Sequence, residues 1–137
     1  MVTITLKGRE IPLLYTVWEM KEIQEEIAPL SQAISLVLGR NPEDKEDTSR
    51  YGGAEHLAAA SKLIRILGNA GLEESGEEGD ITDKWVLRHM KPAMVLIYAV
   101  GVMTVISQGN MMEAKEEKKG PVDEIKEEED AKKPQGS

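Results

Sequence analysis

The sequence predicts an α+β fold that is mostly α, in which an N-terminal β-hairpin packs on a bundle of about four to five helices. Two short apolar runs flank a Lys-Gly pair within residues 3–14, which is typical of a hairpin. The residues that follow carry apolar side chains at helical spacing between Gly, Pro and acidic loops. From residue 113 the chain is charged and nearly free of apolar side chains. We therefore expect a globular domain over residues 1–112 and a disordered acidic tail over residues 113–137.

The first helix is expected over residues 17–27. Thr16 stands three residues before Glu19, which is the spacing of a capping box at a helix N-terminus. Four apolar side chains follow at helical spacing: Trp18, Met20, Ile23 and Ile27. Pro29 disfavours helical geometry in the residue before it, so this helix should end near residue 28.

Two further helices are expected in the middle of the chain. One begins near residue 30, and Gly39 is placed to cap its C-terminus. The other spans residues 54–69 and should end at Gly68 or Gly71. The apolar stripe of the first holds Leu30, Ile34, Val37 and Leu38, and that of the second holds Leu57, Ala60, Ile64 and Leu67.

A fourth helix, capped by Asp80 or Thr82, should carry Trp85, Val86 and Met90. Pro92 interrupts it and suits the first turn of a further helix. The apolar segment of that helix, residues 93–106, would rise only about 21 Å, short of the roughly 30 Å hydrocarbon core of a bilayer. We expect a fully buried central helix. A helix that is partly exposed and covered by a second copy of the chain stays open as an alternative.

Composition excludes several classes of protein. The net charge of −8 argues against a nucleic-acid binder, which needs concentrated Lys and Arg. The absence of cysteine excludes disulfides, thiol catalysis and Cys-ligated metal sites. The first ten residues lack the apolar core of a signal peptide, so we expect a cytoplasmic protein and no membrane partner.

Candidate catalytic and metal-binding groups are few. The only histidines, His56 and His89, fall on different expected helices. Glu55 and His56 are adjacent, and adjacent residues do not share a helix face, so we interpret them as a partly exposed pair at a helix start. No phosphate-binding glycine motif, zinc spacing or calcium-loop order occurs. We therefore predict no catalytic, cofactor-binding or metal-binding residues, and a protein that is not an enzyme.

Six residues are candidates for binding a partner: Trp18, Met20, Trp85, Met90, Met94 and Met103. Tryptophan is enriched at binding hot spots, and flexible methionine side chains adapt to varied apolar surfaces. For both tryptophans, packing in the core is the favoured interpretation, and an exposed anchor for a partner is the alternative.

The order of these segments resembles a known family. A hairpin, "ITLKGREIPLLYT", leads into a Glu-rich amphipathic helix, "VWEMKEIQEEIAPL". A helical middle follows, then "LRHMKPAMVLIYAVGVMTVISQGN" and a Lys/Glu tail. Over about residues 2–112, this layout resembles the tail assembly chaperones of long-tailed phages and of prophages in Gram-positive bacteria. The likeness is one of pattern and order, since no invariant catalytic motif defines that family.

The resemblance implies a chaperone that binds and solubilises the tape measure protein during tail assembly in the host bacterial cytoplasm. The tail tube protein is a further candidate partner. The resemblance also implies two product lengths, the longer made by a programmed ribosomal frameshift, and A-rich slippery codons could encode residues 118–120 or 131–134. A homo-oligomer is compatible with the free edge of the hairpin.

Two other functions stay open from the sequence. One is a small membrane-associated protein that inserts residues 93–106 into lipid. The other is an acidic inhibitor that mimics nucleic acid, which is less favoured because Lys and Arg are interspersed through the acidic runs.

Overall fold

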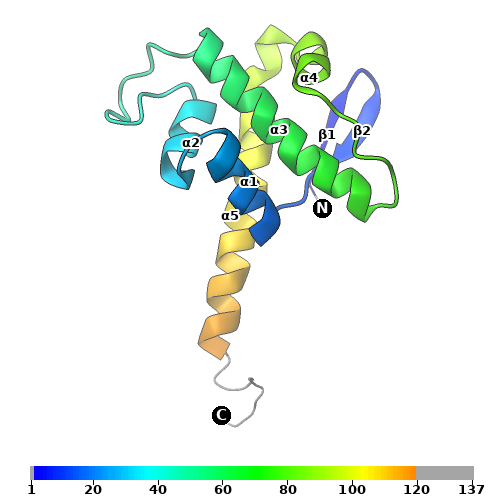
Figure 1. The fold of residues 1–137 in the computed structure, drawn as a ribbon. Coiled ribbons are helices and arrows are strands. Elements are labelled where there is room, and N and C mark those ends of the chain that lie inside the picture. Colours follow the sequence, from blue (N-terminus) through cyan, green and yellow to red (C-terminus); the bar gives the residue numbers. More distant parts are fainter. Residues whose placement is uncertain (1, 120–137) are drawn as a thin grey trace. The chain divides into compact units, whose positions relative to one another are not determined.

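The computed structural model describes residues 2–119, with side chains described for residues 2–110. In chain order the elements are β1 (Thr3–Leu6), β2 (Arg9–Pro12), α1 (Val17–Glu26), α2 (Leu30–Val37), α3 (Ala54–Glu74), α4 (Asp83–His89), the short 3-10 helix η1 (Pro92–Met94) and α5 (Val95–Lys119), as Figure 1 shows. The predicted fold, α+β and mostly α, is confirmed.

The chain divides into two units, Met1–Val105 and Ile106–Ser137, with the division inside α5. The packing described below concerns the first unit. α5 continues through residues 113–119, past the predicted domain boundary. The remainder of the predicted disordered tail, residues 120–137, lies outside the described residues.

The N-terminal hairpin is formed by β1 and β2, which pair antiparallel with Ile4 opposite Ile11. The turn residues Lys7 and Gly8 both have positive φ, 52° and 75°, which matches the right-handed twist of a two-residue hairpin. Alternation along the strands buries Ile4, Leu6 and Ile11 on one face of the hairpin. The hairpin predicted from the sequence is therefore present.

The hairpin packs on α3 at two glycines inside that helix. A Cβ added at Gly71 would lie 1.9 Å from the carbonyl oxygen of Pro12, and one at Gly68 would lie 2.9 Å from Cγ2 of Ile11. The β2 backbone therefore crosses α3 more closely than any side chain at position 71 would permit. The prediction that this helix ends at Gly68 or Gly71 is wrong, because these glycines make room for β2 while the helix continues.

The ends of α1 and α2 carry the signals expected from the sequence. The Thr16 N–H donates to Oε1 of Glu19 at 2.9 Å, and the Thr16 hydroxyl contacts the same oxygen, forming the predicted capping box. At the C-terminus of α2, Gly39 has a φ of 75°, and the Arg40 N–H donates to the carbonyl of Ser35 at 2.9 Å. This pattern is a Schellman motif, so the predicted glycine cap is confirmed.

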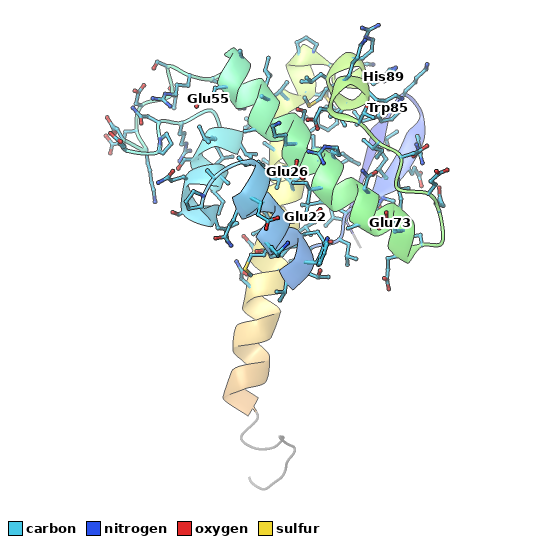
Figure 2. The ribbon with its side chains drawn as sticks, in the orientation of Figure 1. Glu22, Glu26, Glu55, Glu73, Trp85 and His89 are labelled. Carbon is cyan, nitrogen blue, oxygen red and sulfur yellow. The ribbon has the colours of Figure 1, made fainter. Side chains whose placement is uncertain are left out.

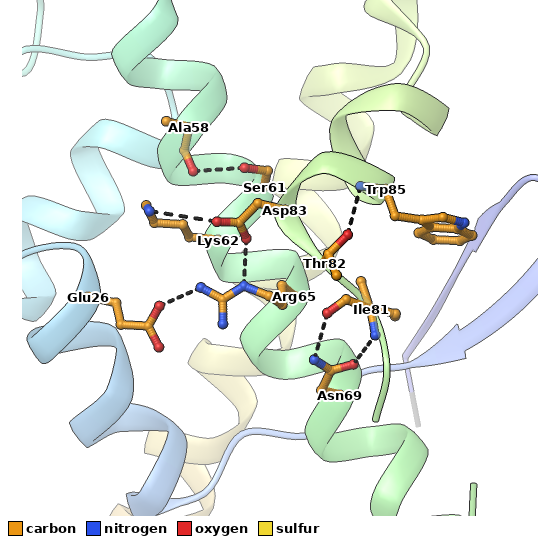
Figure 3. Close-up of polar contacts among 10 residues, drawn as sticks. All are labelled: Glu26, Ala58, Ser61, Lys62, Arg65, Asn69, Ile81, Thr82, Asp83 and Trp85. Atoms are coloured by element: carbon orange, nitrogen blue, oxygen red, sulfur yellow. Dashed lines mark hydrogen bonds and ion pairs between the residues drawn. The ribbon is translucent and has the colours of Figure 1, made fainter. Parts of the chain in front are cut away.

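Arg65 of α3 joins α1 and α4, as Figure 3 shows. Its Nε donates to Asp83 at 2.5 Å, and an η nitrogen donates to Glu26. Lys62 lies 3.7 Å from the other oxygen of Asp83. Burial disfavours the charged guanidinium, but the hydrogen bonds to Glu26 and Asp83 outweigh this effect and raise the pKa of Arg65. One partly buried cation thus fixes the spacing of three helices.

The segment between α3 and α4 is held by Asn69. Its side-chain amide donates to the carbonyl of Ile81 at 3.0 Å and accepts from the Ile81 N–H at 2.9 Å (Figure 3). The Thr82 hydroxyl then accepts from the Trp85 N–H at 3.1 Å and caps α4, which confirms one of the two predicted caps. Pro92 occupies the first turn of η1, as expected.

We predict opposite effects of the same substitution at two helical glycines. Gly71→Ala should lower the free energy of unfolding by at least about 2 kcal/mol, because the new methyl group overlaps the Pro12 backbone. Gly101→Ala should raise it by about 0.5–1 kcal/mol, because its nearest neighbour outside the helix is Cγ2 of Ile4 at 3.5 Å and alanine favours helix. Urea denaturation measures both changes. Equal effects at the two positions would contradict the close contact of β2 with α3.

We also predict that the ion pairs of Arg65 contribute more to the free energy of unfolding than an exposed ion pair does. Arg65→Met keeps the aliphatic stem but removes two ionic hydrogen bonds, and it should cost about 1–2 kcal/mol of unfolding free energy. The control is Arg50→Met, which removes an exposed pair with Glu55 and should cost about 0–0.5 kcal/mol. The measurement is chemical denaturation at low and high salt. A loss at Arg50 as large as that at Arg65 would refute the assigned role.

Candidate functional site

His56, interpreted from the sequence as partly exposed, is buried. The Gly52 N–H donates to its Nδ1 at 2.9 Å, so its Nε2 carries the proton that bonds the Val37 carbonyl at 3.0 Å. The ring of Tyr51 lies 4.7 Å from that of His56. Glu55 points elsewhere and pairs with Arg50 at 3.2 Å (Figure 2). The interpretation of an exposed pair is wrong because His56 turns inward to tie α3 to the end of α2.

Asp and Asn side chains of the loop after α2 accept hydrogen bonds from the loop's own backbone. Asp47 accepts from the Ser49 N–H at 2.9 Å, and Asn41 accepts from the Glu43 N–H at 2.9 Å. The hydrogen bond from the Ser49 backbone is the main reason that the pKa of Asp47 lies below its usual value. Among the described residues, no group of three or more His, Asp or Glu side chains is placed to hold a metal ion. The loop therefore uses these oxygens to shape its turns.

A polar hollow of about 230 Å³ lies between α1 and α3, with Trp18 on its rim. Glu19, Glu22 and Glu73 line it together with Arg65. Burial and repulsion by Glu26 and Glu19 raise the pKa of Glu22, while the attraction of Arg65 opposes this. The hollow carries both signs of charge and includes no histidine, so the groups for nucleophilic or metal chemistry are not assembled there.

α5 was expected to be fully buried, and this expectation is wrong. One face is buried through Tyr98, Ala99 and Val102, whereas Leu96, Ile97 and Val100 are 51%, 58% and 54% exposed. In these three exposed residues, named here the apolar stripe, Val100 lies one helical turn after both Leu96 and Ile97 on the uncovered side of α5. The first unit offers enough neighbours to cover only one side of the helix. The sequence signal was an apolar run on every side, which does not say which side is covered.

The length and hydropathy of α5 also decide whether it could span a membrane. Residues Pro92–Asn110 form a stretch of 19 residues with a mean hydropathy of 1.6, of which 28% is buried. The stretch is longer than the 14 residues on which the sequence argument against a span rested, so that length argument does not hold. Core helices of water-soluble proteins share this length and composition, and by itself it is weak evidence of a span.

The six predicted partner-binding residues do not form one surface. The prediction that Trp18 packs in the core is wrong. Its side chain is 60% exposed, and the Lys21 ammonium lies 4.8 Å from its ring. Trp85 is half-buried with its ring 4.8 Å from that of His89 (Figure 2). Met90 is only 8% exposed, which leaves little of it for a partner. Met20, Met94 and Met103 are half-buried.

A second hollow, mostly apolar and of about 230 Å³, adjoins the start of α5. It is lined by Tyr51, Gly52, Leu57, Leu87, Met90, Pro92 and Val95. Leu87 and Tyr51 are themselves 42% and 46% exposed. Val95 lines this hollow, is itself only 6% exposed and directly precedes the apolar stripe in sequence. The hollow and the apolar stripe are thus two apolar features near the start of α5.

Comparison with protein-family models, curated proteins and solved structures finds no match to this chain. Its function must therefore be argued from its own surfaces.

We predict that burial of His56 makes stability depend on pH. Burial lowers the pKa of His56 below its usual 6.5, against the opposing hydrogen bond to Val37, so the unfolded chain binds the proton more readily. The free energy of unfolding should therefore fall as the pH drops below about 6.5 and recover above it. The measurement is the urea midpoint at several pH values between about 5.5 and 7.5.

The variant that isolates this effect is His56→Gln, compared with the unmodified His56 chain, both in a His89→Gln background. The pH dependence over this interval should become shallower in the absence of His56. An unchanged slope would show that the dependence arises from carboxylates elsewhere.

Proposed function

We propose that this chain is a binding protein without enzymatic activity, and that it acts as a phage tail assembly chaperone for the tape measure protein. The observation that carries the proposal is the apolar stripe of Leu96, Ile97 and Val100 on a helix with no charged residue between Lys91 and Glu113. Exposed apolar patches of this kind mark surfaces that bind other apolar surfaces. The order of segments that resembles the tail chaperones supplies the class of partner.

The shape of the stripe favours a helical partner. Residues at positions i, i+1 and i+4 of a helix form a narrow seam that fits the apolar face of another amphipathic helix. Met103 lies farther along α5 and is half-buried, and the hollow beside Val95 could receive one larger side chain. A tape measure protein that is long and helical would present such faces repeatedly. The tail tube protein is proposed as a second partner only on the resemblance.

The surrounding charge suits a protein that must stay dissolved while it displays hydrocarbon. The chain carries 25 acidic and 17 basic side chains, a net charge of −8. Such a charge opposes self-association of the protein. The cytoplasmic location and the absence of a membrane partner stay part of the proposal.

A second candidate function is binding to a lipid bilayer through α5. The observation that favours it is the 19-residue apolar stretch Pro92–Asn110. The lipid hypothesis predicts co-flotation with liposomes, whereas the chaperone hypothesis predicts recovery in the aqueous fraction. Flotation would show that α5 binds lipid, and it would contradict the proposal that this helix binds the tape measure protein.

We predict that polar substitution of the apolar stripe abolishes chaperone activity while leaving the fold intact. The variant is Leu96→Gln with Ile97→Gln and Val100→Gln, all at exposed positions where glutamine suits a helix. The measurement is the soluble fraction of the tape measure protein encoded at the same locus, coexpressed with each form of the chain. We expect the wild-type chain to keep that partner in solution, and the triple variant to leave most of it insoluble, because the lost burial weakens binding by at least about tenfold.

The matched control carries three glutamines elsewhere, at Glu43, Glu46 and Glu74, which are also exposed. This control should behave as the wild-type chain does. Circular dichroism and urea midpoints verify that both variants fold. Equal solubilisation by the wild-type and stripe variants would overturn the assignment of the site, and no solubilisation by the wild-type chain would overturn the proposed function itself.

A further inference from the structure

A hollow of about 300 Å³ lies between the hairpin turn and the segment that joins α4 to α5. These two parts of the first unit approach each other in Figure 1. The apolar stripe contributes no residue to this hollow, so it is a separate candidate site. We name it the cationic hollow, and its lining residues are Thr5, Lys7 and Gly8 of the hairpin with His89, Lys91, Met94 and Tyr98 on the other side.

The charged side chains that line the cationic hollow are all basic. The ammonium groups of Lys7 and Lys91 make no ion pair with another described residue. No carboxylate is among the described residues that line the hollow. Glu10 stands opposite Thr5 in the register of the hairpin but is not part of the lining. An anion in the hollow would therefore meet two positive charges that nothing in the described chain pairs with.

Tyr98 has a hydroxyl group without a hydrogen-bond partner among the described residues. The residue is only 7% exposed and lines the cationic hollow, yet its hydroxyl makes no hydrogen bond with another described side chain or backbone group. The hydroxyl groups of buried tyrosines usually have such a partner. The Tyr98 hydroxyl can therefore donate to an acceptor that enters the hollow. This observation is independent of the charges and also points to a ligand that carries oxygen atoms.

His89 is held so that one of its ring nitrogens stays available. Its Nδ1 donates to the Trp85 carbonyl at 2.9 Å, and its ring lies 4.8 Å from that of Trp85 (Figure 2). Its Nε2 makes no hydrogen bond with a described residue. The hydroxyl of Thr5 is likewise without a described partner. Two hydroxyl groups, one imidazole and two ammonium groups thus line the same hollow.

These groups favour a phosphate monoester over a carboxylate as the ligand. No arginine is among the described residues of the lining, so planar two-point recognition of a carboxylate is not provided. Lysine acts as a point charge and suits a compact dianion whose oxygens accept hydrogen bonds from several directions. A phosphate monoester is such a group, with a charge of about −1.5 to −2 at pH 7. Met94 and the ring of Tyr98 supply apolar surface for the remainder of the ligand.

We propose that the cationic hollow binds the phosphate monoester group of a small ligand that carries a short apolar or aromatic substituent. Its volume of about 300 Å³ is at the lower end of the range for small-molecule pockets. The net charge of −8 repels a long polyanion such as nucleic acid, whereas a small dianion responds mainly to the nearby lysines. The proposal does not depend on the tape measure protein, because it uses no residue of the apolar stripe.

The hairpin turn offers a variant that removes a charge and preserves the fold. Lys7 has a φ of 52°, a conformation that asparagine adopts more readily than lysine. Lys7→Asn therefore keeps the turn and removes one ammonium group. Lys84→Gln is the matched control, because Lys84 is exposed, makes no ion pair with a described residue and lies outside the lining. Tyr98→Phe removes only the hydroxyl group.

Titration of the full chain with phenyl phosphate, followed by ¹H–¹⁵N NMR, tests the proposal. The amide signals of Gly8 and Lys91 should shift and saturate, and benzoate should bind at least about threefold more weakly. Lys7→Asn should weaken the binding of phenyl phosphate roughly fivefold and Tyr98→Phe roughly threefold. Lys84→Gln should change it by less than about twofold.

Two further measurements separate binding from folding and identify the source of the phosphate. Phenyl phosphate should raise the urea midpoint of the wild-type chain more than that of Tyr98→Phe, whereas without ligand the two midpoints should be equal. Flotation with phosphatidylcholine vesicles, with and without phosphatidic acid, distinguishes a lipid headgroup from a soluble ligand. Flotation that requires both phosphatidic acid and Lys7 assigns the phosphate to a lipid, and its absence assigns the phosphate to a soluble monoester.

Three results would overturn the proposal. A lack of saturable shifts up to about 20 mM phenyl phosphate would show that the hollow is not a binding site. Equal losses with Lys84→Gln and Lys7→Asn would indicate a general response to charge. Equal affinity for benzoate and phenyl phosphate would exclude selection of a phosphate group.

Discussion

The contact between the β2 backbone and α3 is the constraint on which the rest of the fold depends. A two-stranded hairpin is barely stable alone, so its strands need a surface to cover their apolar face. α3 supplies that surface because Gly68 and Gly71 leave no side chain in the way, and the Leu14 N–H donates to the Leu67 carbonyl at 3.1 Å. The same helix then contacts α1, α2 and α4, as Figure 1 shows. A shift of the hairpin would therefore displace the helix against which α1, α2 and α4 also pack.

Polar side chains form directional links between α3 and the elements around it. Arg65 sets the positions of α1 and α4, Asn69 fixes the segment before α4, and His56 fixes the end of α2. Each bond is directional, whereas the aliphatic core of Leu, Ile, Val and Ala could pack in several ways. A chain with no phenylalanine and few other aromatic residues has few large, shape-specific core groups, so these bonds carry much of the specificity of the fold.

The sequence predicted the local structure well and the tertiary roles less well. The hairpin turn at Lys7 and Gly8 and the capping box at Thr16 depend on neighbours a few residues apart, so their patterns were sufficient. Gly71 was misinterpreted because a glycine that ends a helix and a glycine that admits a strand look the same in sequence. The predictions that Trp18 and all of α5 are buried were wrong for a related reason. Apolar character predicts burial, but Trp18 is exposed and the first unit covers only one side of α5.

The apolar stripe and the exposed cations Lys84, Arg88 and Lys91 would bind partners by different physics, and this difference makes the two modes separable. Association through the apolar stripe depends on removal of hydrocarbon from water, which moderate salt does not weaken. Association through those cations would depend on charge pairs in high dielectric, which salt screens within about 8–10 Å at physiological ionic strength. A partner that binds more weakly at high salt must therefore use the cations, and a partner that binds equally well must use Leu96, Ile97 and Val100.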